Sequence, residues 1–174
     1  ARRPEIKKFI VIGPDHFEKC RGDFSYSVEK IVTAFGELKP DKKIVADLKK
    51  TGASEDLKCF NGEHAIGVEA NFIKKLYPDA SLTPIIFSYR ARNRNLSRLV
   101  KYLAGHNDIF VIASVDFSHY LTKDKAEMID AITKKKIENL DGHGLELKNV
   151  DSPAALKLML DLARQTGEKT EIID

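Results

Sequence analysis

Short apolar runs alternate along this chain with stripes of apolar residues at helical spacing. Residues 9–12 and 109–113 are apolar at every position. Such runs are typical of strands covered on both faces of a parallel sheet. We therefore expect the two runs to lie parallel in one sheet, with residues 109–113 as a central, buried strand.

Weaker patterns predict the remaining elements. Residues 24–32 alternate as a strand would, and residues 171–173 resemble the start of another. Residues 82–87 also predict a strand, whose Pro84 fits the beginning or an edge of a sheet. Apolar residues at helical spacing predict five helices, after Pro40 to Gly52, over 63–76, around 96–103, over 123–140 and over 153–165.

Together these elements predict an α/β fold, in which a mostly parallel sheet carries helices on both faces. With 174 residues and no repeat or linker, residues 1–174 fit a single domain. No apolar run approaches the roughly 20 residues that span a membrane. In such folds, ligands bind beyond the carboxyl ends of the strands.

Composition narrows the function classes. The chain is 43% hydrophobic and 32% charged, with a net charge of +3. We expect no nucleic-acid partner, because no aromatic-rich strand accompanies its scattered basic residues. The densest basic group is Arg90, Arg92, Arg94 and Arg98. We interpret these arginines as solvated loop and helix residues.

The two cysteines, Cys20 and Cys59, lie far apart in the sequence. They could form a disulfide, but reduced thiols are expected if the protein is cytoplasmic, which is the localisation that the sequence favours. Structural zinc is not expected, because the cysteines form no closely spaced pair.

Polar clusters follow both apolar runs. His16 ends the segment Gly-Pro-Asp-His, and Asp116 and His119 lie in Ser-Val-Asp-Phe-Ser-His-Tyr at residues 114–120. Histidine and carboxylate are ligands of iron, zinc and manganese, and also proton carriers. The first cluster could instead be an ordinary turn, and Asp116 could simply cap its loop. Glu63 and His64 form a third cluster, for which a helix-start glutamate and a surface histidine are the simpler interpretation.

Three segments resemble those of one known family. Residues 12–16 (Ile-Gly-Pro-Asp-His), 63–66 (Glu-His-Ala-Ile) and 114–120 are similar, in order and spacing, to motifs of the Memo family. Its microbial members are called AmmeMemoRadiSam system protein B. The resemblance covers the chain from about residue 8 to residue 173. It implies the fold of the class III extradiol dioxygenases and, in at least some members, an iron site.

The resemblance also implies roles for individual residues. His16 matches a metal ligand of the family, and Asp116 and His119 match residues of the same cleft, with His119 at an acid–base position. Glu63 and His64 match a motif but receive no ligand role. We expect His16 and His119 to face one opening, with Asp116 close enough to hydrogen-bond one of them or a shared water.

Two family ligands have no counterpart in this sequence, a histidine in a His-Ala-Gly-Tyr segment and a later cysteine. We therefore expect a central portion of the family domain, truncated at both ends. Iron(II) is the expected cofactor of the intact protein, whereas this fragment alone should bind iron(II) or zinc weakly or not at all.

Three functions remain open. The first is a metal-dependent oxidoreductase in which His119 moves a proton and Asp116 orients it. The second is a non-catalytic protein that binds a small molecule or a peptide in the same cleft, since one fold hosts unrelated functions. The third is a metal-dependent hydrolase. The sequence does not indicate an oligomeric state.

Overall fold

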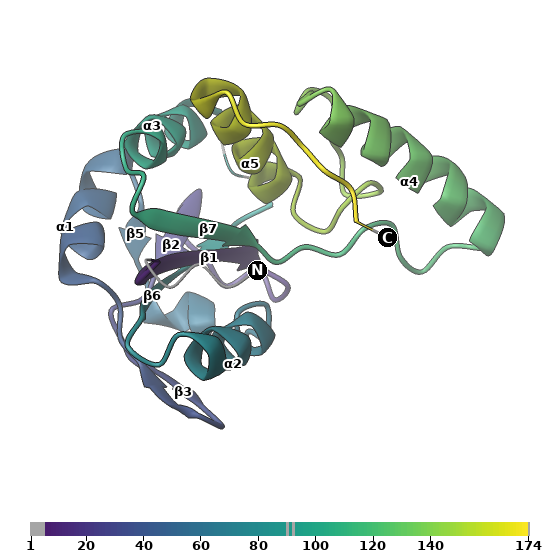
Figure 1. Ribbon diagram of the computed structural model, residues 1–174. Coiled ribbons are helices and arrows are strands. Elements are labelled where there is room, and N and C mark those ends of the chain that lie inside the picture. The colour runs from purple at the N-terminus through teal and green to yellow at the C-terminus, as the bar shows by residue number, and fades with distance from the viewer. Residues whose placement is uncertain (1–5, 90, 92, 174) are drawn as a thin grey trace.

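The computed structural model is an α/β fold built on a five-stranded sheet of order β5-β2-β6-β1-β7 (Figure 1). It describes residues 6–89, 91 and 93–173, so Arg90 and Arg92 lie outside the described residues, while Arg94 and Arg98 are exposed as expected. The strands of this sheet are β1 (Lys8–Pro14), β2 (Phe24–Tyr26), β5 (Ser54–Glu55), β6 (Ser81–Phe87) and β7 (Ile109–Ala113).

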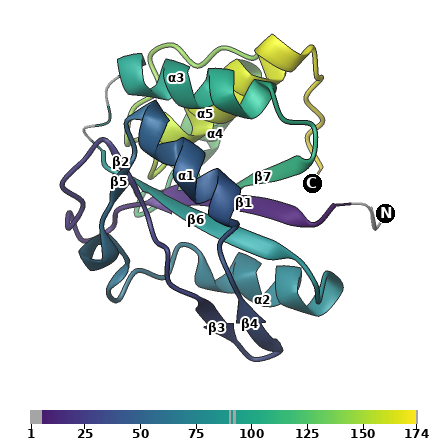
Figure 2. The same ribbon diagram turned by 90° about the vertical axis from the view of Figure 1, so that its left-hand side faces the viewer.

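Helices cover both faces of the sheet, as predicted. One face carries α1 (Lys42–Thr51), α3 (Asn93–Ala104) and α5 (Pro153–Thr166), and the other carries α2 (Gly67–Leu76) (Figures 1 and 2). A small hairpin, β3 (Ile31–Thr33) with β4 (Gly36–Leu38), lies beside α2. A 3-10 turn, η1 (Leu57–Phe60), precedes α2 in the sequence. The long α4 (Lys123–Glu138) reaches outward from α5.

Strand β1 divides the core into two layers. Ile10 and Ile12 pack among side chains of α1, α3 and α5, whereas Phe9 and Val11 pack against α2 and β4. All four are at most 3% exposed. Because successive side chains of a strand point to opposite faces, an uninterrupted apolar run is what a strand between two helical layers requires.

The parallel pairing expected from the two apolar runs is confirmed. Strand β1 pairs parallel to β6 on one side and to β7 on the other, with Lys8 opposite Ile109. The sheet is mixed, because β2 runs antiparallel to β6. The expectation that residues 109–113 are central is wrong, since β7 is the last strand of the described sheet and Phe110 is 41% exposed.

Other expectations need correction at their boundaries. Residues 24–32 divide between β2 and β3, which belong to different sheets. Pro84 lies inside β6, an interior strand, but the ladder with β2 starts only at Ile85, so the missing N–H falls outside that ladder. Residues 171–173 form no strand, and Ile173 is 86% exposed.

The helix predictions hold within a few residues, apart from one start. Helix α1 ends at Thr51 and is capped by Gly52, whose φ of 97° suits glycine. Helix α2 begins at Gly67, four residues after the predicted start at Glu63. Within the described part of the chain, no helix has both the length and the apolar character needed to cross a membrane.

Candidate functional site

Three loops meet beyond the carboxyl ends of β1 and β7. The N–H of Ser114 donates to the carbonyl of Ile12 at 2.8 Å, which keeps the loops after the two strands side by side. The loop before α5 joins them, because the N–H of Asp151 donates to the carbonyl of Asp116 at 3.0 Å. This is the edge at which ligands bind in parallel sheets.

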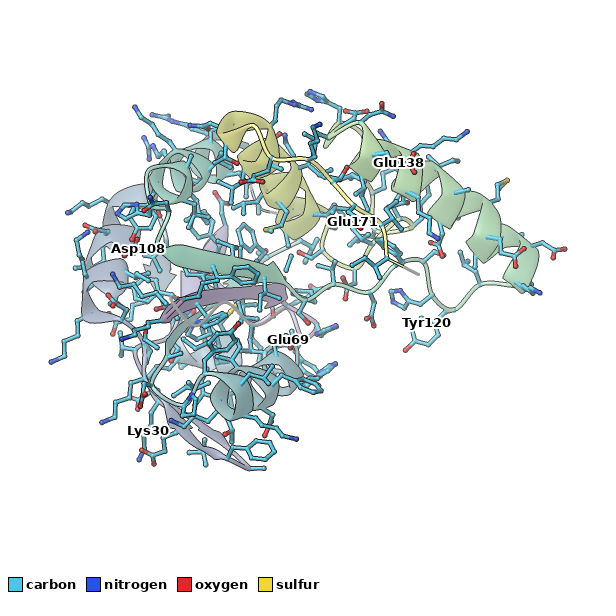
Figure 3. All side chains as sticks on the ribbon, in the orientation of Figure 1. Lys30, Glu69, Asp108, Tyr120, Glu138 and Glu171 are labelled. Atoms are coloured by element: carbon cyan, nitrogen blue, oxygen red, sulfur yellow. A yellow bond between two sulfur atoms is a disulfide. The ribbon has the colours of Figure 1, made fainter. Side chains whose placement is uncertain are left out.

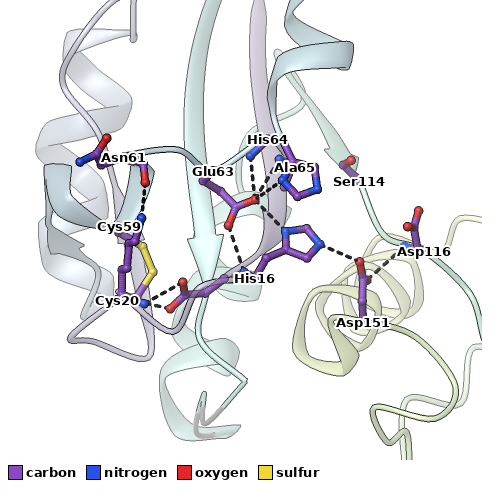
Figure 4. A network of polar contacts seen from close by, with 12 residues as sticks. His16, Cys20, Cys59, Asn61, Glu63, His64, Ala65, Ser114, Asp116 and Asp151 are labelled. Atoms are coloured by element: carbon purple, nitrogen blue, oxygen red, sulfur yellow. Dashed lines mark hydrogen bonds and ion pairs between the residues drawn. A yellow bond between two sulfur atoms is a disulfide. The ribbon is translucent and has the colours of Figure 1, made fainter. Parts of the chain in front are cut away.

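His16 is held by Glu63, which comes from the turn before α2 (Figure 4). Nδ1 of His16 lies 2.7 Å from Oε1 of Glu63, and the backbone N–H of His16 donates to Oε2 at 3.0 Å. The N–H groups of His64 and Ala65 also donate to Oε1, at 2.8 and 3.1 Å. Four N–H donors thus satisfy a carboxylate whose side chain is 1% exposed.

These contacts fix the charge of Glu63 and the orientation of His16. Burial pushes the pKa of Glu63 upward, but the hydrogen bonds from the His16 ring and from the N–H groups of Ala65 and His16 hold it below its usual value. An ionised carboxylate only accepts hydrogen bonds, so Nδ1 of His16 carries the proton. In the neutral ring, Nε2 then keeps its lone pair.

Nε2 of His16 faces the carboxylate of Asp151. The distance from Nε2 to Oδ2 of Asp151 is 3.6 Å, and the Asp151 side chain is 11% exposed. Its other oxygen, Oδ1, accepts the N–H of Asp116 at 3.0 Å. Burial raises the pKa of Asp151, while the hydrogen bond from Asp116 N–H opposes that shift. The imidazole therefore lies between two carboxylates (Figure 4).

A small cavity of about 210 Å³ opens beside this pair. Its walls combine two histidines with carboxylates from three elements, and the lining residues are Pro14, His16, His64, Ala65, Val68, Glu69, Ser114, Val115, Asp116 and Asp151. Ser114 donates its hydroxyl to Oε1 of Glu69 at 2.9 Å, whereas Oε2 of Glu69 is buried without a hydrogen-bond partner. Figure 3 shows Glu69 on the α2 side of the sheet.

A larger hollow of about 560 Å³ lies around Pro40 and Ser81. Ser81 begins β6, so this hollow belongs to the amino ends of the parallel strands, and its lining contains no histidine. The smaller cavity is therefore the better candidate site.

The structure brings only some of the predicted residues together. His16 and Asp116 line the cavity, but no hydrogen bond joins the Asp116 carboxylate to either histidine among the described residues. His119 is exposed farther along the loop, where Nδ1 lies 2.9 Å from the carbonyl of Phe117. Burial raises the pKa of Asp151 and the electrostatic interaction with His119 opposes that rise, but His119 is not among the residues that line the cavity.

The next residue, Tyr120, is 99% exposed and projects from the loop between β7 and α4 (Figure 3). Its ring lies beside that of His119, with centroids 4.8 Å apart. The expectation that His16 and His119 face one opening stays a prediction.

A disulfide fastens the loops that carry His16 and Glu63. Cys20 and Cys59 are joined, which is the alternative to the reduced thiols favoured from the sequence. Asp15 is buried and accepts the N–H groups of Lys19 and Cys20, at 3.0 and 2.8 Å. The side chains of Asp15, Cys20 and Cys59 lie close enough together to be potential metal ligands. The two sulfurs are joined in a disulfide, however, so they are not thiolates and bind no zinc.

Sequence reasoning missed the roles of two carboxylates. Glu63 was interpreted as a helix-start residue, yet it supports His16 from 47 residues away. Ligand atoms of His16, Glu63 and His64 lie within 4.8 Å of one another, and the two imidazoles stack at 4.3 Å. Asp151 carried no signal beyond preceding the helix start at Ser152 and Pro153. The resemblance of residues 63–66 to a family motif was the one clue to Glu63.

Comparisons with known proteins agree on one family. The family model described as "Memo-like protein" matches residues 1–166. A "MEMO1 family protein" of Archaeoglobus fulgidus is 24% identical over 142 residues, or 79% of this chain and 54% of the relative. Another, of Methanobrevibacter smithii, is 28% identical over 146 residues, or 79% and 50%.

A third relative, the "MEMO1 family protein" of Methanococcoides burtonii, is 27% identical over 188 residues, covering 99% of this chain and 70% of the relative. The chain spans about half the length of the first two relatives. The match of the family model over residues 1–166 and the three motifs at the sheet edge lead to the same conclusion. This chain belongs to the Memo-like protein family.

Proposed function

We propose that this chain carries the metal-binding cleft of a Memo-family oxidoreductase, with iron(II) held by Nε2 of His16. The observation that carries the proposal is the contact of 2.7 Å between His16 and Glu63. Metal-binding histidines usually donate their second ring N–H to a carboxylate, which fixes the tautomer and makes the free nitrogen a stronger donor. Glu63 supplies such support.

The cavity residues fit a cation. Its walls carry the carboxylates of Glu69, Asp116 and Asp151, and no lysine or arginine is among the described lining residues. Oε2 of Glu69 is buried without a hydrogen-bond partner, and such an oxygen is costly unless a positive group compensates it. A histidine nitrogen with carboxylate oxygens suits iron(II), manganese(II) or zinc(II).

Bound iron(II) would supply one-electron chemistry with dioxygen, and the protein groups would position and protonate the substrate. We assign His119 to proton transfer. Its Nδ1 donates to the carbonyl of Phe117, so Nε2 of the neutral ring is free to accept a proton. We assign Asp116, which is exposed at the cavity, to orienting the substrate. We propose a phenolic substrate because the resemblance to the Memo family implies the fold of the class III extradiol dioxygenases.

A binding protein without catalysis is the second candidate. The cavity volume of about 210 Å³ lies below the roughly 300–1,000 Å³ of ligand pockets and favours an ion or a very small molecule over a peptide. The acidic walls favour a cationic ligand. A metal-dependent hydrolase would use the same donors to activate water.

Oxygen consumption with catechols in the presence of iron(II) tests the proposal. The protein is compared with His16→Ala and with His143→Ala, a control that replaces a histidine outside this cavity. The sequence predicts weak iron(II) binding by this chain alone, but the cavity adds the carboxylates of Glu69, Asp116 and Asp151 to His16, so we now propose that the chain itself binds the ion. We expect iron-dependent oxygen uptake that is lost in His16→Ala and kept in His143→Ala. A ligand-induced rise in melting temperature without turnover would instead favour the binding protein. Equal uptake by all three proteins would contradict the role of His16.

A further inference from the structure

We propose that Asp151 is a second metal ligand, so that one divalent cation binds between Nε2 of His16 and Oδ2 of Asp151. This inference rests on the proposed metal-binding role of His16 and extends it to a residue in the loop before α5. Neither the sequence pattern nor the family motifs pointed to Asp151.

The distance between the two atoms supports a shared cation. Nε2 and Oδ2 are 3.6 Å apart, which exceeds the roughly 2.7–3.2 Å of a hydrogen bond. Two neighbouring ligands that each lie about 2.0–2.2 Å from one ion are separated by roughly 3.0–3.6 Å. The distance between Nε2 and Oδ2 therefore matches that between two ligands of one metal ion, and it is too long for a direct hydrogen bond.

The backbone holds Asp151 in a position suited to binding. Oδ1 accepts the N–H of Asp116, and the N–H of Asp151 donates to the carbonyl of Asp116. An antiparallel bridge between Phe117 and Val150 continues this pairing. One carboxylate oxygen is thus fixed by hydrogen bonding, and the other, Oδ2, is directed at His16 (Figure 4). Such outer contacts orient metal ligands.

The surroundings define the kind of cation. One imidazole nitrogen and one carboxylate oxygen suit iron(II), manganese(II), cobalt(II) or zinc(II), whereas calcium and magnesium prefer oxygen donors alone. Glu69 and Asp116 add negative charge to the same cavity. The alternative is an ion pair between a protonated His16 and Asp151. In that case Asp151 would influence metal affinity only through its charge and not as a ligand.

The test is a zinc(II) titration of the protein labelled with ¹⁵N-histidine, followed by the Nε2 resonance of His16. Zinc(II) is diamagnetic and reports binding without turnover. Asp151→Asn removes the charge but keeps an oxygen that can accept the N–H of Asp116. Asp161→Asn is the matched control, because it removes a carboxylate from α5 that pairs with Lys157 instead of lining the cavity.

We expect the His16 resonance to shift with zinc(II) in the wild type and in Asp161→Asn, and the affinity of Asp151→Asn to fall about ten-fold or more. Asp151→Glu, which keeps the carboxylate, should lose less affinity than Asp151→Asn. It also provides a second comparison if Asp151→Asn folds poorly.

Two failures are distinguishable. If Asp151→Asn and Asp161→Asn bind zinc(II) equally at His16, Asp151 is not a ligand but the proposed metal role of His16 stands. If zinc(II) leaves the His16 resonance of the wild type unchanged, the proposed metal function fails and the inference fails with it.

Discussion

His16 and Glu63 are in direct contact, with Nδ1 at 2.7 Å from Oε1, although 47 residues separate them in the sequence. The Glu63 side chain is 1% exposed, and within the described part of the chain it accepts hydrogen bonds from His16, His64 and Ala65. The contact therefore fixes the imidazole and also joins the loop after β1 to the turn before α2.

Replacing Glu63 by glutamine should destabilise the protein. The amide NH2 of glutamine would replace one carboxylate oxygen and point its own N–H groups at N–H donors that now bind that oxygen. Those buried donors would then lack an acceptor. We expect Glu63→Gln to lower the free energy of unfolding by about 1–3 kcal/mol. Urea unfolding measures this, with Glu127→Gln as the control, because the ion pair of Glu127 with Lys123 is exposed. Equal stability of the two variants would contradict the structural role of Glu63.

The contribution of Glu63 to stability should depend on pH in a defined direction. Its pKa is lowered in the folded protein, because hydrogen bonds from His16 and Ala65 outweigh burial. A lowered pKa stabilises the folded state above the unfolded value of about 4.3, and this stabilisation is lost as the pH falls through the folded value. The stability difference between wild type and Glu63→Gln should therefore shrink in acid. A difference that grows below about pH 4 would contradict the assignment.

Gly13 should tolerate no side chain, because it lies against the turn that carries Glu63. A Cβ at Gly13 would lie 2.5 Å from Cβ of Ala65. We expect Gly13→Ala to destabilise the protein by about 1–3 kcal/mol through overpacking. Gly67→Ala is the matched control, since a Cβ at Gly67 meets nothing within 4 Å. Thermal unfolding of both variants decides the point, and similar melting temperatures would refute the steric argument.

The sequence correctly predicted helices on both faces of the sheet, but it did not predict which strands lie next to each other. Residues 9–12 and 109–113 revealed two parallel strands, because consecutive apolar residues require cover on both faces. The same pattern could not report how many strands pair with each, so β7 was misplaced at the centre. The apolar run ends at residue 12, but β1 continues to Pro14, and Gly13 of the first motif permits close packing on Ala65.

The candidate site could be predicted only in part, for a related reason. His16 follows an apolar strand and could be found from that position alone. Glu63 and Asp151 act on it from other elements, and a single sequence contains no signal for contacts between such distant segments. We expect the Asp116 carboxylate close enough to hydrogen-bond a histidine or a shared water, which stays a prediction; a role that the sequence does not reveal is that its backbone holds Asp151.

The disulfide should stabilise the loops around the site. Cys20 and Cys59 are separated by 39 positions in the sequence, and closing a loop of that size by a disulfide gives a stabilisation of about 2–4 kcal/mol in the chain-entropy account. We expect a lower melting temperature for Cys20→Ala/Cys59→Ala, and a similar loss for the wild type in reductant. The double variant itself should not respond to reductant, which makes it the control. A wild-type melting temperature that reductant leaves unchanged would argue against the disulfide.

Asp151 should reduce the stability of the metal-free protein. Burial and the negative charge of Asp116 raise its pKa in the folded state, against the opposing hydrogen bond from Asp116 N–H. A raised pKa stabilises the folded protein only below the unfolded value of about 3.9, and that contribution is lost as the pH rises through the folded value. Near neutral pH the ionised carboxylate is therefore unfavourable.

Asp151→Asn in the presence of a chelator should consequently be more stable than the wild type at about pH 7, and this advantage should vanish below about pH 4. Asparagine keeps an acceptor for the N–H of Asp116, so the loop pairing is preserved. Urea unfolding across this pH range gives the answer, and Asp161→Asn should show no gain because it loses its pairing with Lys157. A large loss of stability in Asp151→Asn would mean that the carboxylate holds the loops together. A gain would mark it as a residue whose cost to the fold is offset by what it binds, because natural proteins retain destabilising groups chiefly at functional sites.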